Sequence, residues 1–276
     1  MKRKKSCKTL GVIDLLITGH QHQTFIGRDD QTLYVQAGQN AEQLIHVNIN
    51  FKKRTSSYEL ENVDSHIVDL NEYEEDEHLL HLTHYDRKAV EYWSTETLTN
   101  QGVNVTVDGL ADVICKPHKF TQLLHDSIRL KYNYDISCVH LPTNGESGLT
   151  ESVTNGSLYY AYPHPDVPVD LTLKGQHIKD ILEYGYSHIE FSDGKLSLTI
   201  IDETLCTFWQ GVDYTIDMNA KPFDRVTLNN IKLDHVYRVS MTDYCYRNYR
   251  QYLENAVIHD TGDVTMFELI SKKFKR

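Results

Sequence analysis

The chain has 276 residues, 40% of them hydrophobic, and a formal net charge of −11 at pH 7. This length suits one large domain or two ordinary ones, and the apolar fraction is enough to build a core, which excludes global disorder. The acidic charge disfavours DNA or RNA as the main partner, because phosphate backbones require a basic surface.

Compartment and redox state can also be inferred from the sequence. No apolar run approaches the roughly 20 residues that span a bilayer, so no membrane partner is expected. The basic start "MKRKKSCKTLG" is not followed by the apolar core of a signal peptide, which predicts cytoplasmic localisation for the chain as it stands. The widely spaced cysteines form no Cys-x-x-Cys pair and predict free or buried thiols: Cys7, Cys115, Cys138, Cys206 and Cys245.

In chain order, the first predicted elements are short strands. Residues 9–53 alternate apolar runs with polar turns, and "QLIHVNINFK" has the period of two that is typical of a strand. A few short strands bury too little surface to fold independently. This region is therefore predicted to be the tail of a larger sheet. Residues 60–100 are acidic and predict helices, with Asp69 or Asn71 as the first N-cap.

The remaining residues, 105–276, combine helical and strand patterns. "KFTQLLHDSIRLKY" and "QHIKDILEYG" have helical spacing, and the second is predicted to stop at Gly185. Strands are predicted in six segments: "VDLTLKG", "KLSLTII", "VDYTIDM", "RVTLNNI", "VYRVSM" and "AVIHDTG". Because helices are interleaved with several adjacent strands, the fold class is predicted to be mixed α/β, α+β-like, with some antiparallel pairing.

Two histidines follow the first predicted strand in "DLLITGHQH". In an extended backbone, His20 and His22 point to the same side and would each reach one ion of a two-metal pair. The alternative is two ordinary histidines of a surface loop, because a chain with 15 histidines produces this spacing by chance.

Several segments together resemble one family. "DLLITGHQH" resembles the last metal-binding motif of calcineurin-like metallophosphoesterases. "YNYDIS", "YAYPHPDVPVDLTLKGQHIKDILEY", "FWQGVDYTIDM" and "VYRVSMTDYCYRNY" resemble, in the same order, segments of a nucleoside-binding domain. Over most of residues 9–255, the chain is thus similar to the C-terminal part of the 5'-nucleotidase and 2',3'-cyclic-nucleotide 2'-phosphodiesterase family.

The resemblance implies an architecture with three parts. Residues 1–58 would be the remnant of an αββα metallophosphoesterase domain, residues 59–102 would form linker helices, and residues 103–276 would be a 5'-nucleotidase C-terminal α/β domain. In the family, the first domain holds two divalent ions of the zinc or manganese type, and the last binds a nucleotide or nucleoside between two aromatic rings.

The resemblance also implies roles for particular residues. His20 and His22 would be metal ligands, His164 and Tyr244 would form the base clamp, and Asp166 and Gly211 would lie against the base. Taken alone, His164 is equally an ordinary turn residue between two prolines, and Tyr244 is one of 18 tyrosines, for which packing is the default role.

The chain also departs from the family. The Asp-x-His, Gly-Asp and Gly-Asn-His motifs that precede Gly-His-x-His in the family are missing, so no catalytic set is complete. Bulky Arg247, Tyr249 and Arg250 stand where the family has glycines, and these arginines are expected to form surface ion pairs.

These features lead to three hypotheses. The first is a metal-dependent nucleotide phosphohydrolase of nucleotide catabolism, here a truncated form with little activity and weak or absent metal, whose full-length parent would be secreted or cell-surface. The second is a non-catalytic nucleoside-binding module. The third is one half of a split enzyme, with a separate chain carrying the missing catalytic half.

Overall fold

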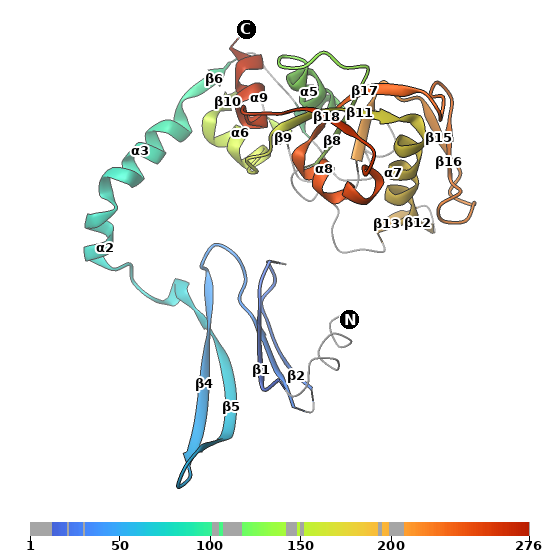
Figure 1. Ribbon diagram of the computed structural model, residues 1–276. Coiled ribbons are helices and arrows are strands. Elements are labelled where there is room, and N and C mark those ends of the chain that lie inside the picture. Colours follow the sequence, from blue (N-terminus) through green and yellow to red (C-terminus); the bar gives the residue numbers. More distant parts are fainter. Residues whose placement is uncertain are drawn as a thin grey trace. The chain divides into compact units, whose positions relative to one another are not determined.

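The computed structural model describes residues 13–20, 22–29, 31–100, 105–106, 118–141, 148–149, 152–192, 195–198 and 207–275. The chain divides into two compact units, Met1–Tyr85 and Asp86–Arg276 (Figure 1). Among the described residues, no helix combines the length and apolar character needed to cross a membrane.

The N-terminal unit is built from two small sheets. The first has the order β1-β3-β2, with β3 (Leu33–Gln36) parallel to β1 (Leu15–Thr18) and antiparallel to β2 (Phe25–Arg28). The second is the hairpin of β4 (Gln43–Lys53) and β5 (Tyr58–Asp69). Among the described residues of this unit, a small core joins the two sheets; it consists of Leu33, Val35 and Val63, with the half-buried Leu15, Ile45, Val47 and Leu60 packed against them.

Strand β5 corrects the prediction of linker helices from residue 59. Residues 58–69 pair with β4 along the whole hairpin, for example Ile49 with Val63 and Ile45 with Ile67. The segment was assigned to a helical region because it is acidic, but cross-strand packing decides strand formation more than composition does. The helical part of the linker therefore begins after β5.

The linker helices are shorter than predicted. Asp69 caps only the 3-10 turn η1 (Leu70–Glu72). The α-helix that follows η1, α2 (Glu77–Leu82), has Asp76 as its N-cap, and the Asp76 side chain accepts a 2.9 Å hydrogen bond from the Leu79 N–H. The next helix, α3, covers His84–Thr95, and neither helix has a buried residue. Tertiary packing therefore contributes little to either helix.

The C-terminal unit is organised around a five-stranded sheet with the order β14-β8-β17-β11-β18. Strands β8 and β17 are parallel and the other neighbours are antiparallel, which confirms the predicted mixed α/β class. The strands are β8 (Ile136–His140), β11 (Pro168–Lys174), β14 (Thr207–Gln210), β17 (Val236–Thr242) and β18 (Val257–Thr261).

Helices cover both faces of this sheet (Figure 1). Val139 and Leu141 pack into one core with α5 (Lys119–Ile128), α6 (Asn155–Ala161) and α9 (Met266–Phe274). Ile136 and Cys138 pack into a second core with α7 (Gly175–Ser187) and α8 (Asp243–Asn248). Alternate residues of a strand point to opposite faces, so His140 is placed on the face of α7 and α8.

Smaller elements complete this unit. Helix α7 continues to Ser187, so the predicted stop at Gly185 is wrong by two residues. The turn η3 (Arg250–Tyr252) follows α8. The remaining strands form two-stranded ladders: β6 (Thr97–Thr99) with β10 (Val153–Thr154), β7 (Val105–Thr106) with β9 (Gly148–Leu149), β12 (Ile189–Ser192) with β13 (Lys195–Leu198), and β15 (Tyr214–Ile216) with β16 (Val226–Leu228).

Candidate functional site

The histidines predicted as metal ligands lie in the loop after β1. His20 and His22 are exposed, and both have a left-handed backbone, with φ of 79° and 53°. The loop is held by Gln36, which is buried: it accepts a 3.0 Å hydrogen bond from the Thr18 hydroxyl and donates a 2.7 Å hydrogen bond to the Gln23 carbonyl. Both ends of the loop are therefore tied to β3.

The described residues do not fit a two-metal centre. Across the described parts of the chain, no group of three or more histidine, cysteine, aspartate or glutamate side chains is placed to hold a metal ion. His20 and His22 offer two imidazoles, whereas protein metal centres of this kind need at least three protein ligands per ion. The role of the two histidines as ligands stays a prediction.

The predicted base-clamp region lies where two loops meet. Asp166 is in the loop before β11, and Tyr244 is in the first turn of α8. Two hydrogen bonds join the residues next to them, Val167 and Asp243. The Asp243 N–H donates to the Val167 carbonyl at 2.8 Å, and the Val167 N–H donates to the Asp243 carboxylate at 3.1 Å. The structure thus brings together the two segments that carry Asp166 and Tyr244.

A residue that was not predicted, His140, lies at the centre of this region. Its ring stacks on that of Tyr244, with the centroids 4.2 Å apart and the planes at 26°. Its Nε2 atom is 3.4 Å from the Asp166 carboxylate, and its Nδ1 atom is 3.1 Å from the Thr242 hydroxyl. The side chain of His140 is 1% exposed, so these contacts fix the plane of the ring.

Asp166 is buried beneath the clamp region. Its carboxylate accepts a 3.0 Å hydrogen bond from the Tyr162 hydroxyl and faces His140, and the side chain is 4% exposed. Burial raises the pKa of the Asp166 carboxyl above its ordinary value, while the neighbouring His140, Tyr162 and His164 act in the opposite direction. His164 itself is exposed. We refer to the buried group of His140, Asp166, Tyr162, Thr242 and Cys245 as the polar cluster.

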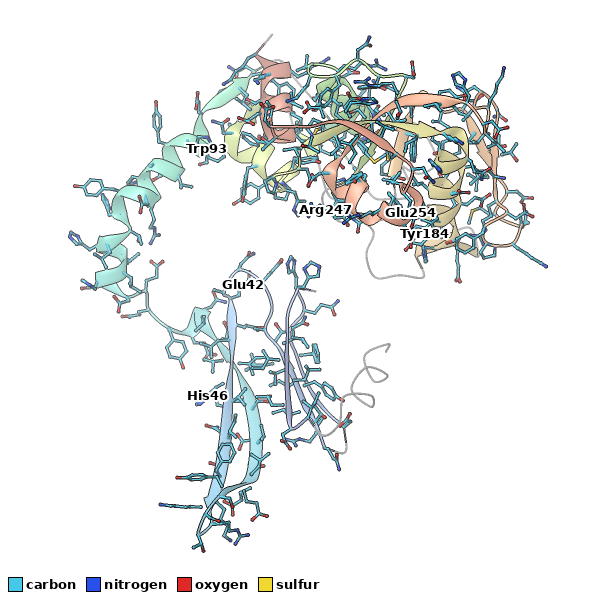
Figure 2. All side chains as sticks on the ribbon, viewed as in Figure 1. Glu42, His46, Trp93, Tyr184, Arg247 and Glu254 are labelled. Atoms are coloured by element: carbon cyan, nitrogen blue, oxygen red, sulfur yellow. The ribbon has the colours of Figure 1, made fainter. Side chains whose placement is uncertain are left out.

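Arg247 borders the polar cluster from the surface side of α8 (Figure 2). Its guanidinium is 3.0 Å from the Asp243 carboxylate and 4.0 Å from that of Asp166, and its side chain is 66% exposed. The expected surface ion pair of Arg247 is therefore present.

Gly211 has a structural reason to be glycine. It follows β14 with φ of +87°, and a Cβ there would collide with the carbonyl of Asp135 just before β8. The Gly211 carbonyl also accepts a 3.0 Å hydrogen bond from the Asn230 side chain. Close packing of two backbones accounts for the residue, and its predicted contact with a base stays untested.

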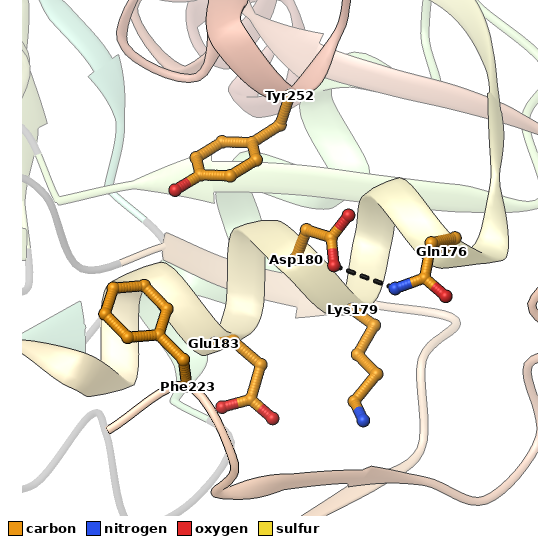
Figure 3. A pocket seen from close by; sticks show the side chains of 6 residues that line it. All are labelled: Gln176, Lys179, Asp180, Glu183, Phe223 and Tyr252. Carbon is orange, nitrogen blue, oxygen red and sulfur yellow. Dashed lines mark hydrogen bonds between the residues drawn. The ribbon is translucent and has the colours of Figure 1, made fainter. Parts of the chain in front are cut away.

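A pocket of about 230 Å³ lies elsewhere in this unit, and it contains none of the predicted site residues. It is lined by Gln176, Lys179, Asp180, Glu183, Phe223 and Tyr252 (Figure 3). Glu183 is committed to the fold, because its carboxylate accepts 2.9 Å hydrogen bonds from the backbone N–H groups of Arg225 and Val226. The volume is below the range of roughly 300–1,000 Å³ that is usual for ligand pockets.

Solved structures share this fold. A candidate 5'-nucleotidase from Staphylococcus aureus in complex with α-ketoglutarate matches all of this chain and 56% of its own, at 21% identity and a TM-score of 0.82. A 5'-nucleotidase precursor from Thermus thermophilus matches 95% of this chain and 56% of its own, at 16% identity and a TM-score of 0.61. The sulfate thiohydrolase SoxB of Thermus thermophilus, in complex with glycerol, matches 99% of this chain and 49% of its own, at 15% identity and a TM-score of 0.55.

The chain therefore spans about half of each of these proteins. A search of curated proteins gave no match. In the comparison with family models, residues 101–253 match the model described as 5'-nucleotidase, C-terminal domain. This match covers more than half of the sequence, and the chain belongs to the 5'-nucleotidase C-terminal domain family.

Proposed function

We propose that the C-terminal unit recognises the nucleoside part of a nucleotide, as the binding domain of a 5'-nucleotidase-type phosphohydrolase. The observation that carries this proposal is the stacked pair of His140 and Tyr244, held by a buried carboxylate, within the segment that matches the family. Fold alone would not support it, because one neighbour of this fold is a sulfate thiohydrolase.

In this proposal, Tyr244 is the platform on which the base stacks. Stacking of a base on an aromatic ring is worth about 1–3 kcal/mol. His140 holds the Tyr244 ring at 26° to its own plane, so less side-chain freedom is lost when a ligand binds. His164 would form the other side of the clamp, with an imidazole ring in place of a larger aromatic.

Asp166 and Gly211 contribute differently. Asp166 is bonded to Tyr162 and faces His140, so its main effect is to orient the platform and to add negative charge near the base. That charge would favour bases with an exposed amino group, because the hydrogens of an amino group carry partial positive charge. Gly211 would let the chain after β14 approach the base closely.

The hydrolytic part of the proposal rests on the family alone. His20 and His22 would contribute to a centre of two divalent ions of the zinc or manganese type. Such ions supply a Lewis acid and an activated water. The remaining ligands would come from other residues, for which a separate chain is the proposed source, and this chain is expected to show little hydrolysis by itself.

A second candidate function is a nucleoside-binding module without catalysis. It is favoured by the exposed positions of His20 and His22 and by the lack of a third ligand among the described residues. The two candidates share the same binding surface and differ only in whether a metal centre is assembled.

Calorimetry with adenosine tests the shared part of both candidates. Tyr244→Ala is expected to weaken binding by roughly 5- to 150-fold, which corresponds to the loss of about 1–3 kcal/mol of stacking. Tyr160→Ala is the matched control, because Tyr160 is 81% exposed in the same unit and carries no predicted role. Equal affinities in the two variants would remove Tyr244 from the site.

Hydrolysis assays separate the two candidates. The substrates are 3'-AMP, 5'-AMP and 2',3'-cyclic AMP, each with Mn²⁺ or Zn²⁺. Turnover that the double variant His20→Ala/His22→Ala abolishes would support the phosphohydrolase. Adenosine binding with no turnover, together with no binding of Mn²⁺ or Zn²⁺ that the double variant removes, would support the non-catalytic module.

A further inference from the structure

The polar cluster contains one thiol, that of Cys245, and a second thiol, that of Cys138, packs in the same core. Cys138 is in the middle of β8 and Cys245 is in the first turn of α8. Both are free cysteines, and both are completely buried. The proposed function uses neither of them.

The sheet and the helix cap bring the two sulfur atoms together. Cys138 pairs with Met241 across the parallel strands β8 and β17, and it lies on the same face of β8 as His140. The next residue, Thr242, ends β17 and caps α8, so Cys245 sits directly over this part of β8. Both side chains belong to the same buried core, and each affects the pKa of the other.

The polar cluster surrounds Cys245 with groups that can take its proton. The Nδ1 atom of His140 is 3.8 Å from the Cys245 sulfur, and the Thr242 hydroxyl donates to that sulfur at 3.2 Å. Burial raises the pKa of the Cys245 thiol, but hydrogen bonds with Cys138 and His140 outweigh it and lower the pKa to about 6. Burial and the neighbouring Cys245 raise the pKa of Cys138 well above its usual range. Cys245 is assigned as the thiol that reacts first, because the imidazole of His140 and the hydroxyl of Thr242 both contact its sulfur.

We propose that Cys138 and Cys245 form an intrachain disulfide when a peroxide oxidises them, and that this disulfide weakens nucleoside binding at Tyr244. The second half of this inference rests on the proposed function; the first half does not.

The oxidation proceeds in two steps. His140 takes the proton of Cys245, and the thiolate attacks one oxygen of hydrogen peroxide; the O–O bond breaks, and the hydroxide that leaves takes the proton from His140 to become water. Cys245 is then a sulfenic acid. Cys138 attacks its sulfur, the S–O bond breaks, and hydroxide leaves with the Cys138 proton as a second water. Two thiols and one peroxide thus give one disulfide and two waters.

The burial of both thiols determines the class of oxidant. Neither side chain is accessible to solvent, so a bulky disulfide such as oxidised glutathione has no path to the sulfur atoms. Hydrogen peroxide is close in size to water and needs only a small opening of the structure.

The disulfide would act on Tyr244 through the backbone. Forming the bond brings the two sulfur atoms to about 2.05 Å, which pulls the first turn of α8 towards β8. Tyr244 precedes Cys245 in that turn, and its ring stacks on His140 at 4.2 Å. The same reaction removes the sulfur from its hydrogen bond with Thr242, so the stack is expected to be displaced.

The first experiment uses a variant that keeps only this pair of thiols, with Cys7→Ser, Cys115→Ser and Cys206→Ser. After treatment with hydrogen peroxide, intact mass spectrometry should show the loss of two hydrogen atoms, and peptide mapping should link Cys138 to Cys245. Two titratable thiols in the denatured, treated protein would overturn the proposal. Oxidation by glutathione disulfide at the same rate would overturn the choice of oxidant.

Two further variants test the mechanism in the same background. Cys138→Ser should stop at the sulfenic acid, which a dimedone adduct would reveal at Cys245. His140→Gln should slow disulfide formation by roughly tenfold, because the base is lost. If His140→Gln does not fold, Cys245→Ser serves instead; a dimedone adduct at Cys138 in that variant that forms as fast as the adduct at Cys245 in Cys138→Ser would overturn the assignment of the first thiol to Cys245.

Adenosine affinity is then compared in the reduced and oxidised forms. Oxidation is expected to weaken binding by roughly tenfold, and dithiothreitol should restore it. Equal affinities would overturn the effect on Tyr244. A disulfide that forms in a protein that binds no adenosine in either state would refute the proposed function and leave the oxidation intact.

Discussion

The two regions of the molecule that carry candidate histidines hold them in opposite ways. His20 and His22 are exposed on a loop of the N-terminal unit, whose core has only three fully buried apolar residues among those described. His140 is buried in the C-terminal unit and contacts an aromatic ring, a carboxylate and a hydroxyl. A buried polar group is costly unless it is paired, so the contacts of His140 constrain its position far more than those of the loop histidines do.

The difference shows which part of the chain holds its candidate site residues in fixed positions. The C-terminal unit places its polar groups inside two packed cores, whereas the N-terminal unit leaves large apolar side chains such as Ile17 and Phe51 exposed. Binding by preformed contacts is therefore expected of the C-terminal unit. The following predictions test this contrast, beginning with the largest effect.

Truncation of a core side chain should separate the two units most clearly. Leu171 is completely buried in β11, so Leu171→Ala should lower the free energy of unfolding by about 2–5 kcal/mol. Ile49 in β4 is 45% exposed, and Ile49→Ala should cost less than about 1 kcal/mol. Urea titration followed by tryptophan fluorescence reports the first change, because Trp93 and Trp209 both lie in the C-terminal unit.

Circular dichroism, which also detects the hairpin, reports the second change. Equal losses from the two substitutions would mean that the N-terminal unit is as tightly packed as the C-terminal one, and the contrast would fail.

Titration of a buried histidine should have the next largest effect. His125 accepts or donates a 2.7 Å hydrogen bond with the Ser137 hydroxyl, and burial lowers its pKa to about 4. In the unfolded chain its pKa is about 6.5, so the unfolded state binds the proton more tightly. Stability is therefore complete above about pH 6.5 and is lost as the pH falls towards 4, by up to about 3 kcal/mol.

The measurement is urea unfolding at several pH values between 4 and 7.5. His125→Gln should remove most of this pH dependence, while His259→Gln should leave it unchanged, because His259 is exposed on β18 of the same unit. A flat profile for the unaltered protein would contradict the prediction.

Much of the C-terminal fold could be predicted from the sequence, because its strands and helices have clear apolar periods. The segments that became β11, β17, α5 and α7 are examples. Strand β5 could not be predicted from the sequence, because its acidic residues conceal the alternation of apolar and polar side chains and its pairing with β4 depends on tertiary contacts.

The site was less predictable than the fold. Tyr244 and Asp166 were predicted as site residues through a family resemblance, and His140, which contacts both, was not predicted. Its only signal in the sequence is a polar residue at the end of the wholly buried strand β8. Its contacts depend on the parallel pairing of β8 with β17, which joins residues about 100 positions apart and has no local pattern.

Removal of one hydroxyl from the polar cluster should have a moderate effect. Tyr162→Phe deletes the 3.0 Å hydrogen bond to Asp166 and should lower the free energy of unfolding by about 1–2 kcal/mol. Tyr160→Phe is the matched control, because that ring is 81% exposed, and it should change stability by less than about 0.5 kcal/mol. Both are measured by urea unfolding with tryptophan fluorescence; equal stabilities would show that the hydroxyl of Tyr162 is not needed in the cluster.

The smallest effect is expected at the tip of the N-terminal hairpin. Arg54 and Glu59 form an ion pair there, but their side chains are 51% and 59% exposed. Solvent screens such a pair and both long side chains lose freedom in forming it, so Arg54→Ala should change the free energy of unfolding by less than about 0.5 kcal/mol. Thermal unfolding followed by circular dichroism, with and without 0.5 M salt, is the measurement, and added salt should not change the difference between the two proteins much.

The Arg238–Asp170 pair is the matched comparison, because the Asp170 carboxylate is 3% exposed and would remain buried without its cation in Arg238→Ala. A larger loss for Arg54→Ala than for Arg238→Ala would reverse the contrast between the exposed polar groups of one unit and the buried ones of the other.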